Sequence, residues 1–365
     1  MVSSIWCDKF HPQFLSKGFR RIIMRKKWLE LILISIVASL VIMACDKPQP
    51  DSVGYDHVIT VVCEPENWDA CEPILAETLG KIFKTPRTEP LYTLQRIDAS
   101  DLSINLKNKN LMILTRLEVY SEVTQQVRSM LPDSIIHGIR ENPRGYYYQE
   151  DAYAKGQALV VVAAKSIADL RSRLKVNQDH ILDFYEQKMY ERNTAFIYRS
   201  GEQFELAEKY FNQYGYYIRM MHDFVEIENN ASKNLVWLGR DFPYRWLSVS
   251  WAAPVDSLEL GVQTDLLLRS TLTSKIGSII LNEDYLQQES MWFKQFSAIK
   301  YYGLWESKEE IKGGPFIAYS FYEPTKDRIY LLAGIIHAPD KSKIPYIRQM
   351  ETIIRTFETE LFEPK

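Results

Sequence analysis

The sequence predicts an α+β fold, a mixed or antiparallel sheet packed by helices, with two α/β halves of similar size as a further option. Strand-like apolar runs are mixed with helical periodicities without strict βαβ alternation, and the second half is richer in strands. Apolar residues make up 46% of the 365 residues and aromatic residues 13%, which is enough for a substantial core. We expect a globular domain over 57–365, with halves at 57–200 and 201–365.

In the first half, continuous apolar runs indicate the strands. Val58–Cys63 and Leu159–Ala164 are such runs and predict buried strands. Apolar residues recur at helical spacing over 69–84, which predicts an amphipathic helix. The other predicted elements are strands near 91–97 and 110–116 and helices near 119–131, 166–174, 178–198 and 203–213.

The second half alternates strand-like segments with few helices. The predicted strands are 216–221, 224–229, 234–240, 245–251, 293–304, 315–322 and 328–337. A helix is expected over 256–276, with Asp256 as N-cap and Gly277 just after its end. The last helix begins near Pro345 and has one apolar stripe: Ile347, Met350, Ile354, Phe357 and Leu361.

Residues 24–44 have the pattern of a secretory signal. Arg25-Lys26-Lys27 precedes an apolar run, Leu31 to Met43, that is shorter than the about 20 residues of a transmembrane helix. The run ends in Ile42-Met43-Ala44-Cys45, which resembles the lipobox of bacterial lipoproteins, where the cysteine is diacylated and the chain is cut before it. We expect a signal peptide over 24–44 and lipidation of Cys45; the alternative is an uncleaved signal anchor.

The segments on either side of this signal have their own expected roles. Residues 1–23 place a mostly polar stretch before the basic cluster, so we expect the natural start at Met24 and a spurious extension over 1–23. Residues 46–56 contain two prolines and a glycine without periodicity, which predicts a lipidated tether over 45–56. A chain anchored in this way lies in the cell envelope. We expect the outer membrane, on its periplasmic or surface face, rather than the inner membrane.

The charge balance argues against nucleic acid as a partner. The chain has 44 basic and 47 acidic residues, and 7 and 2 of these lie in 1–44, so cleavage would leave 37 and 45. A net charge near −8, spread over the sequence, provides no basic face for a phosphate backbone.

Two cysteines follow the predicted tether. Cys63 and Cys71 flank a short segment between a strand and a helix, and an oxidising compartment would permit a disulfide between them. Two buried free thiols are the equal alternative. No metal site is expected, because no second Cys or His pair lies nearby, and no motif points to a cofactor.

Several short segments together resemble one known family. They are Glu89-Pro90, Leu235-Val236-Trp237-Leu238, Gly303-Leu304-Trp305, Gly313-Gly314-Pro315-Phe316 and His337-Ala338-Pro339. The family is the Bacteroidota lipoprotein domain-of-unknown-function family 4837, and the likeness is expected to cover about 57–360. The family pattern has an arginine before Gly-Leu-Trp, where this chain has Tyr302. The resemblance implies an envelope lipoprotein and no particular activity.

The segment from Tyr302 to Phe316 is the first candidate binding site. Gly313 and Gly314 would allow a close backbone approach, while Trp305 and Phe316 offer flat apolar faces for a glycan, a peptide or a lipid headgroup. The alternative is a hairpin whose loop needs glycine dihedrals and whose aromatic rings fill the core.

Three further residues are weaker candidates. Arg269, beside an apolar helical run, could pair with a buried carboxylate, bind an anion or face solvent. His337 with Asp340 is the best local pair for a dispersed catalytic triad, although a polar loop is favoured over it. Neither HExxH, Gly-x-Ser-x-Gly nor a P-loop occurs in the sequence.

These features favour a membrane-anchored envelope lipoprotein that acts as a non-enzymatic binding or assembly module. Its expected partners are the membrane, through the lipid, and an envelope protein or a glycan. The alternative is an envelope hydrolase whose catalytic residues are dispersed in the sequence.

Overall fold

The structure is a computed structural model that describes residues 49–83, 87–277 and 279–360. The predicted signal peptide and Cys45 lie outside the described residues. Residues 51–365 form one unit by their contacts. Within the described ranges, no helix combines the length and the hydropathy needed to cross a membrane.

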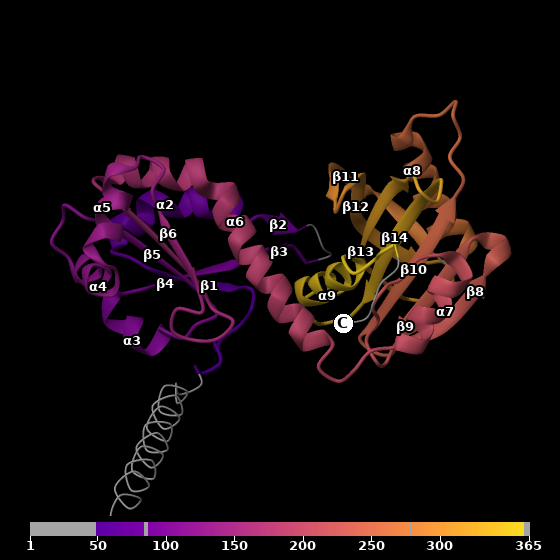
Figure 1. Ribbon diagram of the computed structural model, residues 1–365, viewed down its shortest axis with the longest axis horizontal. Helices are drawn as coiled ribbons and strands as arrows, with labels where there is room; N and C mark the ends of the chain where they lie inside the picture. The colour runs from indigo at the N-terminus through magenta and orange to yellow at the C-terminus, as the bar shows by residue number, and fades with distance from the viewer. Residues whose placement is uncertain (1–48, 84–86, 278, 361–365) are drawn as a thin grey trace, which may run out of the picture. The chain divides into compact units, whose positions relative to one another are not determined.

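The first half is built on a five-stranded sheet (Figure 1). In spatial order the strands are β4 (Thr93–Ile97), β1 (Val58–Val62), β5 (Asn110–Arg116), β7 (Ala158–Ala164) and β6 (Tyr147–Glu150). The first four are parallel neighbours, and β6 pairs antiparallel with β7. The central strands are apolar on both faces because helices cover both sides of the sheet.

Two groups of helices cover this sheet. On one face lie α2 (Pro65–Thr78) and the 31-residue α6 (Ile167–Ile197). The other face carries η1 (Ala99–Asp101), α3 (Leu102–Asn105), α4 (Glu122–Met130) and α5 (Asp133–Glu141). A short ladder of β2 (Ile82–Phe83) and β3 (Glu89–Pro90) follows α2 in the chain.

The second half is an antiparallel seven-stranded sheet. In spatial order the strands are β11 (Ile279–Phe293), β12 (Phe296–Ser307), β13 (Gly313–Glu323), β14 (Arg328–His337), β10 (Tyr244–Ala252), β9 (Leu235–Arg240) and β8 (Val225–Asn230). One face packs against α7 (Phe204–Tyr214) and α9 (Ile344–Ile354), and the other against α8 (Leu260–Arg269) with the π-helix η3 (Ser270–Lys275). The single turn η2 (Ala231–Lys233) joins β8 to β9.

The expected α+β class is confirmed, and most predicted strands lie within a few residues of their observed bounds. Several elements have no counterpart in the prediction, among them α3, α5, β6 and the edge strand β11. The two helices expected at 166–174 and 178–198 are one helix, because neither proline nor glycine interrupts it. The side chain of Asn177, at the expected break, donates to the Arg173 carbonyl inside α6.

The other differences concern ends and connections. The helix expected at 256–276 begins only at Leu260, and Gly277 follows the π-helix at φ +86°. The strand expected at 216–221 is an irregular segment with two isolated bridges, from Tyr217 and Met221. The last helix ends at Ile354, and the expected stripe residue Leu361 lies outside the described residues.

The end of the expected tether is attached to the domain. Asp51 and Val53 form isolated parallel bridges with Lys155 and Asn108, and the Val53 amide donates to the Lys107 carbonyl at 2.9 Å. Residues 51–56 therefore differ from the free tether expected over 45–56. This attachment was not predicted because it consists of backbone hydrogen bonds to the residues just before β5 and β7. Such bonds do not require the apolar periodicity by which strands are recognised in a sequence.

Candidate functional site

The aromatic platform expected at Trp305 and Phe316 is part of the core. Trp305 is 4% exposed, and its indole Nε1 donates to the Ile336 carbonyl at 3.1 Å, while Phe316 is fully buried. Tyr302 is half-buried, with its ring centroid 5.5 Å from that of Phe83. An open hollow of about 600 Å³ lies beside Trp305, but the two aromatic faces pack inward. The structure therefore agrees with the alternative interpretation, in which this segment is a hairpin whose aromatic rings fill the core.

Gly313 and Gly314 are needed for space and not for an unusual dihedral angle. Both lie in β13 at negative φ, so the expected loop dihedrals are absent at these two positions. A Cβ on Gly314 would lie 2.2 Å from the backbone oxygen of Ile336 in β14, which no side chain can approach so closely. A Cβ on Gly313 would lie 2.8 Å from the Trp305 oxygen. The pair lets β12, β13 and β14 approach one another at this end.

Arg269 is neutralised by two carboxylates. Its Nε lies 2.8 Å from Asp265 Oδ2, and its Nη1 lies 2.5 Å from Glu283 Oε1. The hydrogen bonds that Arg269 donates to the carboxylates of Glu283 and Asp265 raise the pKa of Arg269 above its usual range. With both partners in place, Arg269 is an ion-paired surface residue of α8 and not a free anion ligand.

The expected pair of His337 and Asp340 does not form. His337 Nδ1 lies 2.8 Å from the Gly313 oxygen, whereas Asp340 is 92% exposed and lies 3.9 Å from Arg87. Within the described ranges no histidine has a carboxylate at ion-pair distance, and no group of three His, Cys, Asp or Glu side chains could hold a metal ion.

Cys63 and Cys71 are both free and both buried, which is the second of the two expected alternatives. Cys63 directly follows β1, and Cys71 lies in α2, which packs on the same face of the sheet. Burial raises the pKa of the Cys63 thiol to about 12 and that of Cys71 to about 11. Thiols held in this way are poor nucleophiles.

A further hollow is a groove along α6 and α9, which we call the α6–α9 groove. Its cavity volume is about 840 Å³. α6 contributes residues at helical spacing, Met189, Arg192, Asn193 and Phe196, and α9 contributes its first turns around Ile344. The third wall is segment 51–57 with the residues just before β5 and β7. Ligands of parallel sheets usually bind at the carboxyl ends of the strands. This groove lies at the amino ends of the strands instead, and it exists because α9 provides a wall there.

Five cationic and two acidic side chains line this groove, so it is positive in a chain whose net charge is −3. The cations are Lys109, Lys155, Arg192, Arg199 and Arg348. Asp56 binds two of them, with Lys109 Nζ at 2.9 Å and Arg192 Nε at 2.8 Å from its carboxylate oxygens. Arg192 also donates to the Gly156 carbonyl and to Asn110 Oδ1, which fixes its orientation.

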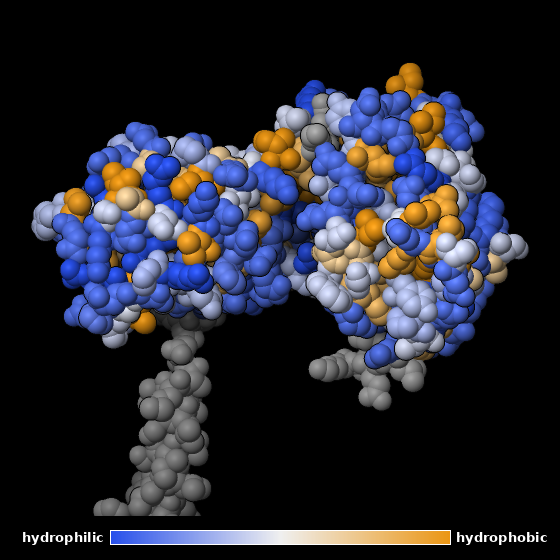
Figure 2. Space-filling model, turned by 90° about the horizontal axis from the view of Figure 1, so that it is seen from above, coloured by the Kyte–Doolittle hydropathy of each residue, from blue (hydrophilic) through white to orange (hydrophobic). Residues whose placement is uncertain are grey.

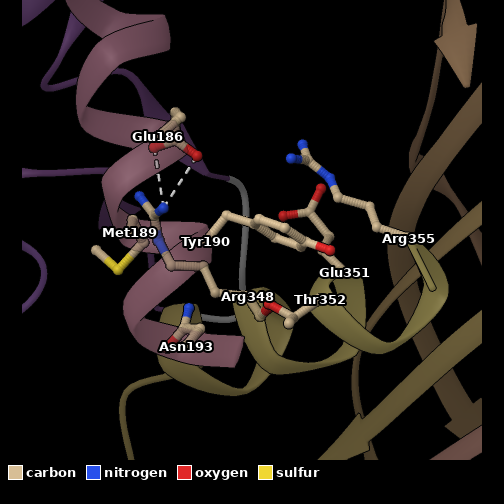
Figure 3. A pocket seen from close by; sticks show the side chains of 8 residues that line it. All are labelled: Glu186, Met189, Tyr190, Asn193, Arg348, Glu351, Thr352 and Arg355. Carbon is tan, nitrogen blue, oxygen red and sulfur yellow. Dashed lines mark hydrogen bonds and ion pairs between the residues drawn. The ribbon is translucent and has the colours of Figure 1, made fainter. Parts of the chain in front are cut away.

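Arg348, one of the residues that line the groove, connects the two helices through an ion pair with Glu186 (Figure 3). Its Nη1 donates to both carboxylate oxygens of Glu186 in α6, at 2.9 and 3.0 Å, and Nη2 donates to the Leu91 carbonyl at 3.2 Å. Desolvation lowers the pKa of Arg348, but Tyr92 and Glu186 outweigh it and raise the pKa above its usual range. Only 6% of the side chain is exposed, so this ion pair fastens α9 to α6.

Glu89, noted in the sequence without a role, caps α9 from the other half of the fold. Its carboxylate accepts hydrogen bonds from the backbone amides of Lys343, at 2.9 Å, and Ile344, at 3.4 Å. A negative side chain at a helix N-terminus satisfies amides that have no partner within the helix. A second hollow of about 300 Å³ adjoins this cap and shares His57 and Ile344 with the α6–α9 groove.

Lys155 and Arg199 are the two groove cations without a carboxylate. Neither makes a side-chain hydrogen bond or ion pair with another described residue, and both are exposed. The guanidinium carbon of Arg199 lies 4.3 Å from the ring centroid of Phe196, whose side chain is 49% exposed. Sequence reasoning missed this site because its walls come from three distant segments. The available signal was the mixed stripe of apolar and cationic residues at the end of α6.

Two family models match the chain. Residues 52–197 match the model described as Domain of unknown function (DUF8532), and residues 204–356 match Domain of unknown function (DUF4837). The expected resemblance to family 4837 is thus confirmed for the second half, whereas its expected extent of 57–360 is wrong. Glu89-Pro90, which contributed to that expectation, lies in the region of the other model.

Two solved structures are similar to part of the chain. The Ran-binding protein Mog1p of Saccharomyces cerevisiae is 10% identical with a TM-score of 0.30, and a point mutant of protein Mog1 is 10% identical with a TM-score of 0.29. Each match covers 40% of this chain and 90% of the other. Likeness at this level assigns neither activity nor partner. A search of curated proteins finds no match. The chain therefore carries two neighbouring regions that match models of domains of unknown function, the second of them DUF4837.

Proposed function

We propose that this chain is an envelope lipoprotein, anchored in a membrane by acyl chains on Cys45, and that its folded part is a non-enzymatic binding module. The observation that carries the binding role is the α6–α9 groove of about 840 Å³, in which Lys155 and Arg199 lack a carboxylate partner among the described residues. Cations left unpaired in a concave site favour a negatively charged ligand.

The attachment of residues 51–56 supports a site close to the anchor. Six residues of chain lead from Cys45 to Asp51, which lines the groove. Fully extended, such a segment spans roughly 20 Å. An acylated Cys45 would thus keep the groove within reach of the bilayer surface. We propose the outer membrane, on its periplasmic or surface face, as that bilayer.

The surface character agrees with a module held by lipid. The face shown in Figure 2 is mostly hydrophilic, with apolar side chains in separate small patches. A face of this kind does not insert into a bilayer by itself, whereas two or more acyl chains provide stable attachment. An envelope protein or a glycan remains the alternative partner for the groove.

Metabolic labelling with an alkyne-tagged fatty acid tests the anchor. We expect label on the wild-type protein and none on Cys45→Ser. The matched control is Cys71→Ser, which replaces a thiol of the folded part and is expected to keep the label. Label on Cys45→Ser equal to that on the wild type, or none on either, would contradict the anchor.

The binding role is tested separately by thermal unfolding. A ligand that binds the folded state raises its Tm. Fractionated envelope lipids, glycans and peptides are added in turn to the detergent-solubilised full chain. At least one fraction is expected to raise the Tm of the wild type and to leave that of Lys155→Glu/Arg199→Glu unchanged. A Tm that no fraction moves would contradict a binding module.

A further inference from the structure

We propose that the α6–α9 groove binds the phosphate headgroup of an anionic membrane lipid, with Lys155 and Arg199 as phosphate ligands and Phe196 as an apolar contact. This inference rests on the proposed function, because it names the ligand of that same groove.

The positions of the paired and unpaired cations indicate where the anion binds. Lys109 and Arg192 share Asp56, and Arg348 is held by both carboxylate oxygens of Glu186. These three cations are therefore held in ion pairs that connect the walls of the groove. Lys155 and Arg199, at the exposed side, keep their full donor capacity for a ligand.

Arg199 is oriented for this role by Phe196. Its guanidinium lies over the ring, with the carbon 4.3 Å from the ring centroid. A guanidinium stacked on a ring keeps its N–H groups at its edge, where they can donate to phosphate oxygens. Charge-assisted hydrogen bonds of this kind are about twice as strong as neutral ones.

The apolar residues of the groove favour a lipid over a free phosphate. Phe196 is 49% exposed, Tyr55 is 73% exposed, and the exposed Pro345 lies on the α9 side. A phosphate ion would use none of this surface. A glycerophospholipid would cover it with the glycerol and the first methylenes of its chains, at a gain of about 0.8 kcal/mol per buried CH₂.

Titration with short-chain lipids tests the proposal on the full chain. The protein, solubilised in an uncharged detergent, is titrated calorimetrically with dihexanoyl-phosphatidylglycerol, dihexanoyl-phosphatidylcholine or inorganic phosphate. We expect phosphatidylglycerol to bind more tightly than either of the other two. Each surface cation near an anionic lipid contributes a factor of about five, so Lys155→Gln/Arg199→Gln should weaken phosphatidylglycerol binding about 25-fold.

The matched control removes the same charge from the same helix. Arg171 and Lys175 are exposed residues of α6 that do not line the groove. Arg171→Gln/Lys175→Gln should change the affinity less than about twofold, because screened charges outside the site contribute little. Phe196→Ala should weaken phosphatidylglycerol binding, because it removes both the apolar contact and the ring over which Arg199 lies. All substituted side chains are exposed, and equal Tm values will confirm that the variants fold.

Three results with lipids and variants, and one with inorganic phosphate, would overturn the inference. The three are absence of phosphatidylglycerol binding, equal affinity for phosphatidylcholine, and equal losses in the groove and control variants. Inorganic phosphate as tight as the lipid would also overturn it, because the site would then recognise an ion alone. Each of these leaves the fatty-acid labelling of Cys45 and the extract-induced Tm shift untouched, so the two proposals fail separately.

Discussion

Glu351 in α9 provides the most quantitative prediction. Its Oε1 lies 2.7 Å from Lys300 Nζ and 2.7 Å from the Tyr319 hydroxyl, and 17% of its side chain is exposed. Burial alone would raise the pKa of this carboxyl. The charges of Lys300 and Arg355, with the hydrogen bonds from Lys300 and Tyr319, outweigh burial and lower the pKa to about 2.

The lowered pKa translates into stability that depends on pH. The ordinary value is 4.5, so the folded state holds the charged form more favourably by about 3 kcal/mol at neutral pH. Since the folded pKa lies below the unfolded one, this stability is fully present above pH 4.5. It is lost as the pH falls from 4.5 towards 2.

Glu351→Gln keeps an oxygen that can accept from Tyr319 but removes the charge next to Lys300. We expect urea denaturation to give a free energy of unfolding about 3 kcal/mol below the wild type at pH 7 and only about 1 kcal/mol below it at pH 3. The control is Glu289→Gln, an exposed carboxylate of β11 without an ion pair in the described ranges, which should be neutral at both values. A difference between wild type and Glu351→Gln that is the same at pH 7 and pH 3 would refute the electrostatic reasoning.

Three further predictions concern packing, capping and thiols. Gly314→Ala places a Cβ against a backbone oxygen and should lower the free energy of unfolding by about 1–3 kcal/mol. Gly138→Ala, which has open space around it in α5, should raise this free energy. Equal urea midpoints for the two variants would contradict the prediction. Glu89→Ala removes the cap of α9 and should lower the free energy of unfolding, measured in urea, by about 1 kcal/mol. An unchanged free energy of unfolding would argue against the cap. Cys63 and Cys71 should resist alkylation at pH 8 until the protein is denatured, and peptide mass spectrometry that finds both labelled in the folded state would disprove their burial.

The fold class was predictable because the core strands carry a simple signal. β1, β5 and β7 are buried on both faces, so their residues form continuous apolar runs that no helix of the same length would require. β11 was missed for the opposite reason. It is an edge strand whose middle, Glu283 to Ser290, is mostly exposed and polar, and an edge strand is specified by its neighbour more than by its own hydrophobicity.

The candidate site was not predictable from local patterns. The aromatic and glycine motif around Trp305 stood out, yet aromatic rings next to glycines satisfy the close packing of three strands as well as they satisfy a ligand. The α6–α9 groove depends on residues near 55, 192 and 348, which only the tertiary structure brings together. Their individual types, two arginines and a tyrosine, are common on any solvated surface.

The walls of the α6–α9 groove come from both matched regions, so a function of this groove cannot be assigned to either region alone. Residues 52–197 supply α6, Lys155 and the segment before β1, whereas residues 204–356 supply α9. The contacts that hold these walls together cross the same boundary, since Glu89 caps α9 and Arg348 binds Glu186. A chain with one region only would lack a wall of the groove, and also the cap and the ion pair that join the two regions. The two regions are therefore expected to act as one binding unit, and the ligand that we propose should stabilise both against unfolding together.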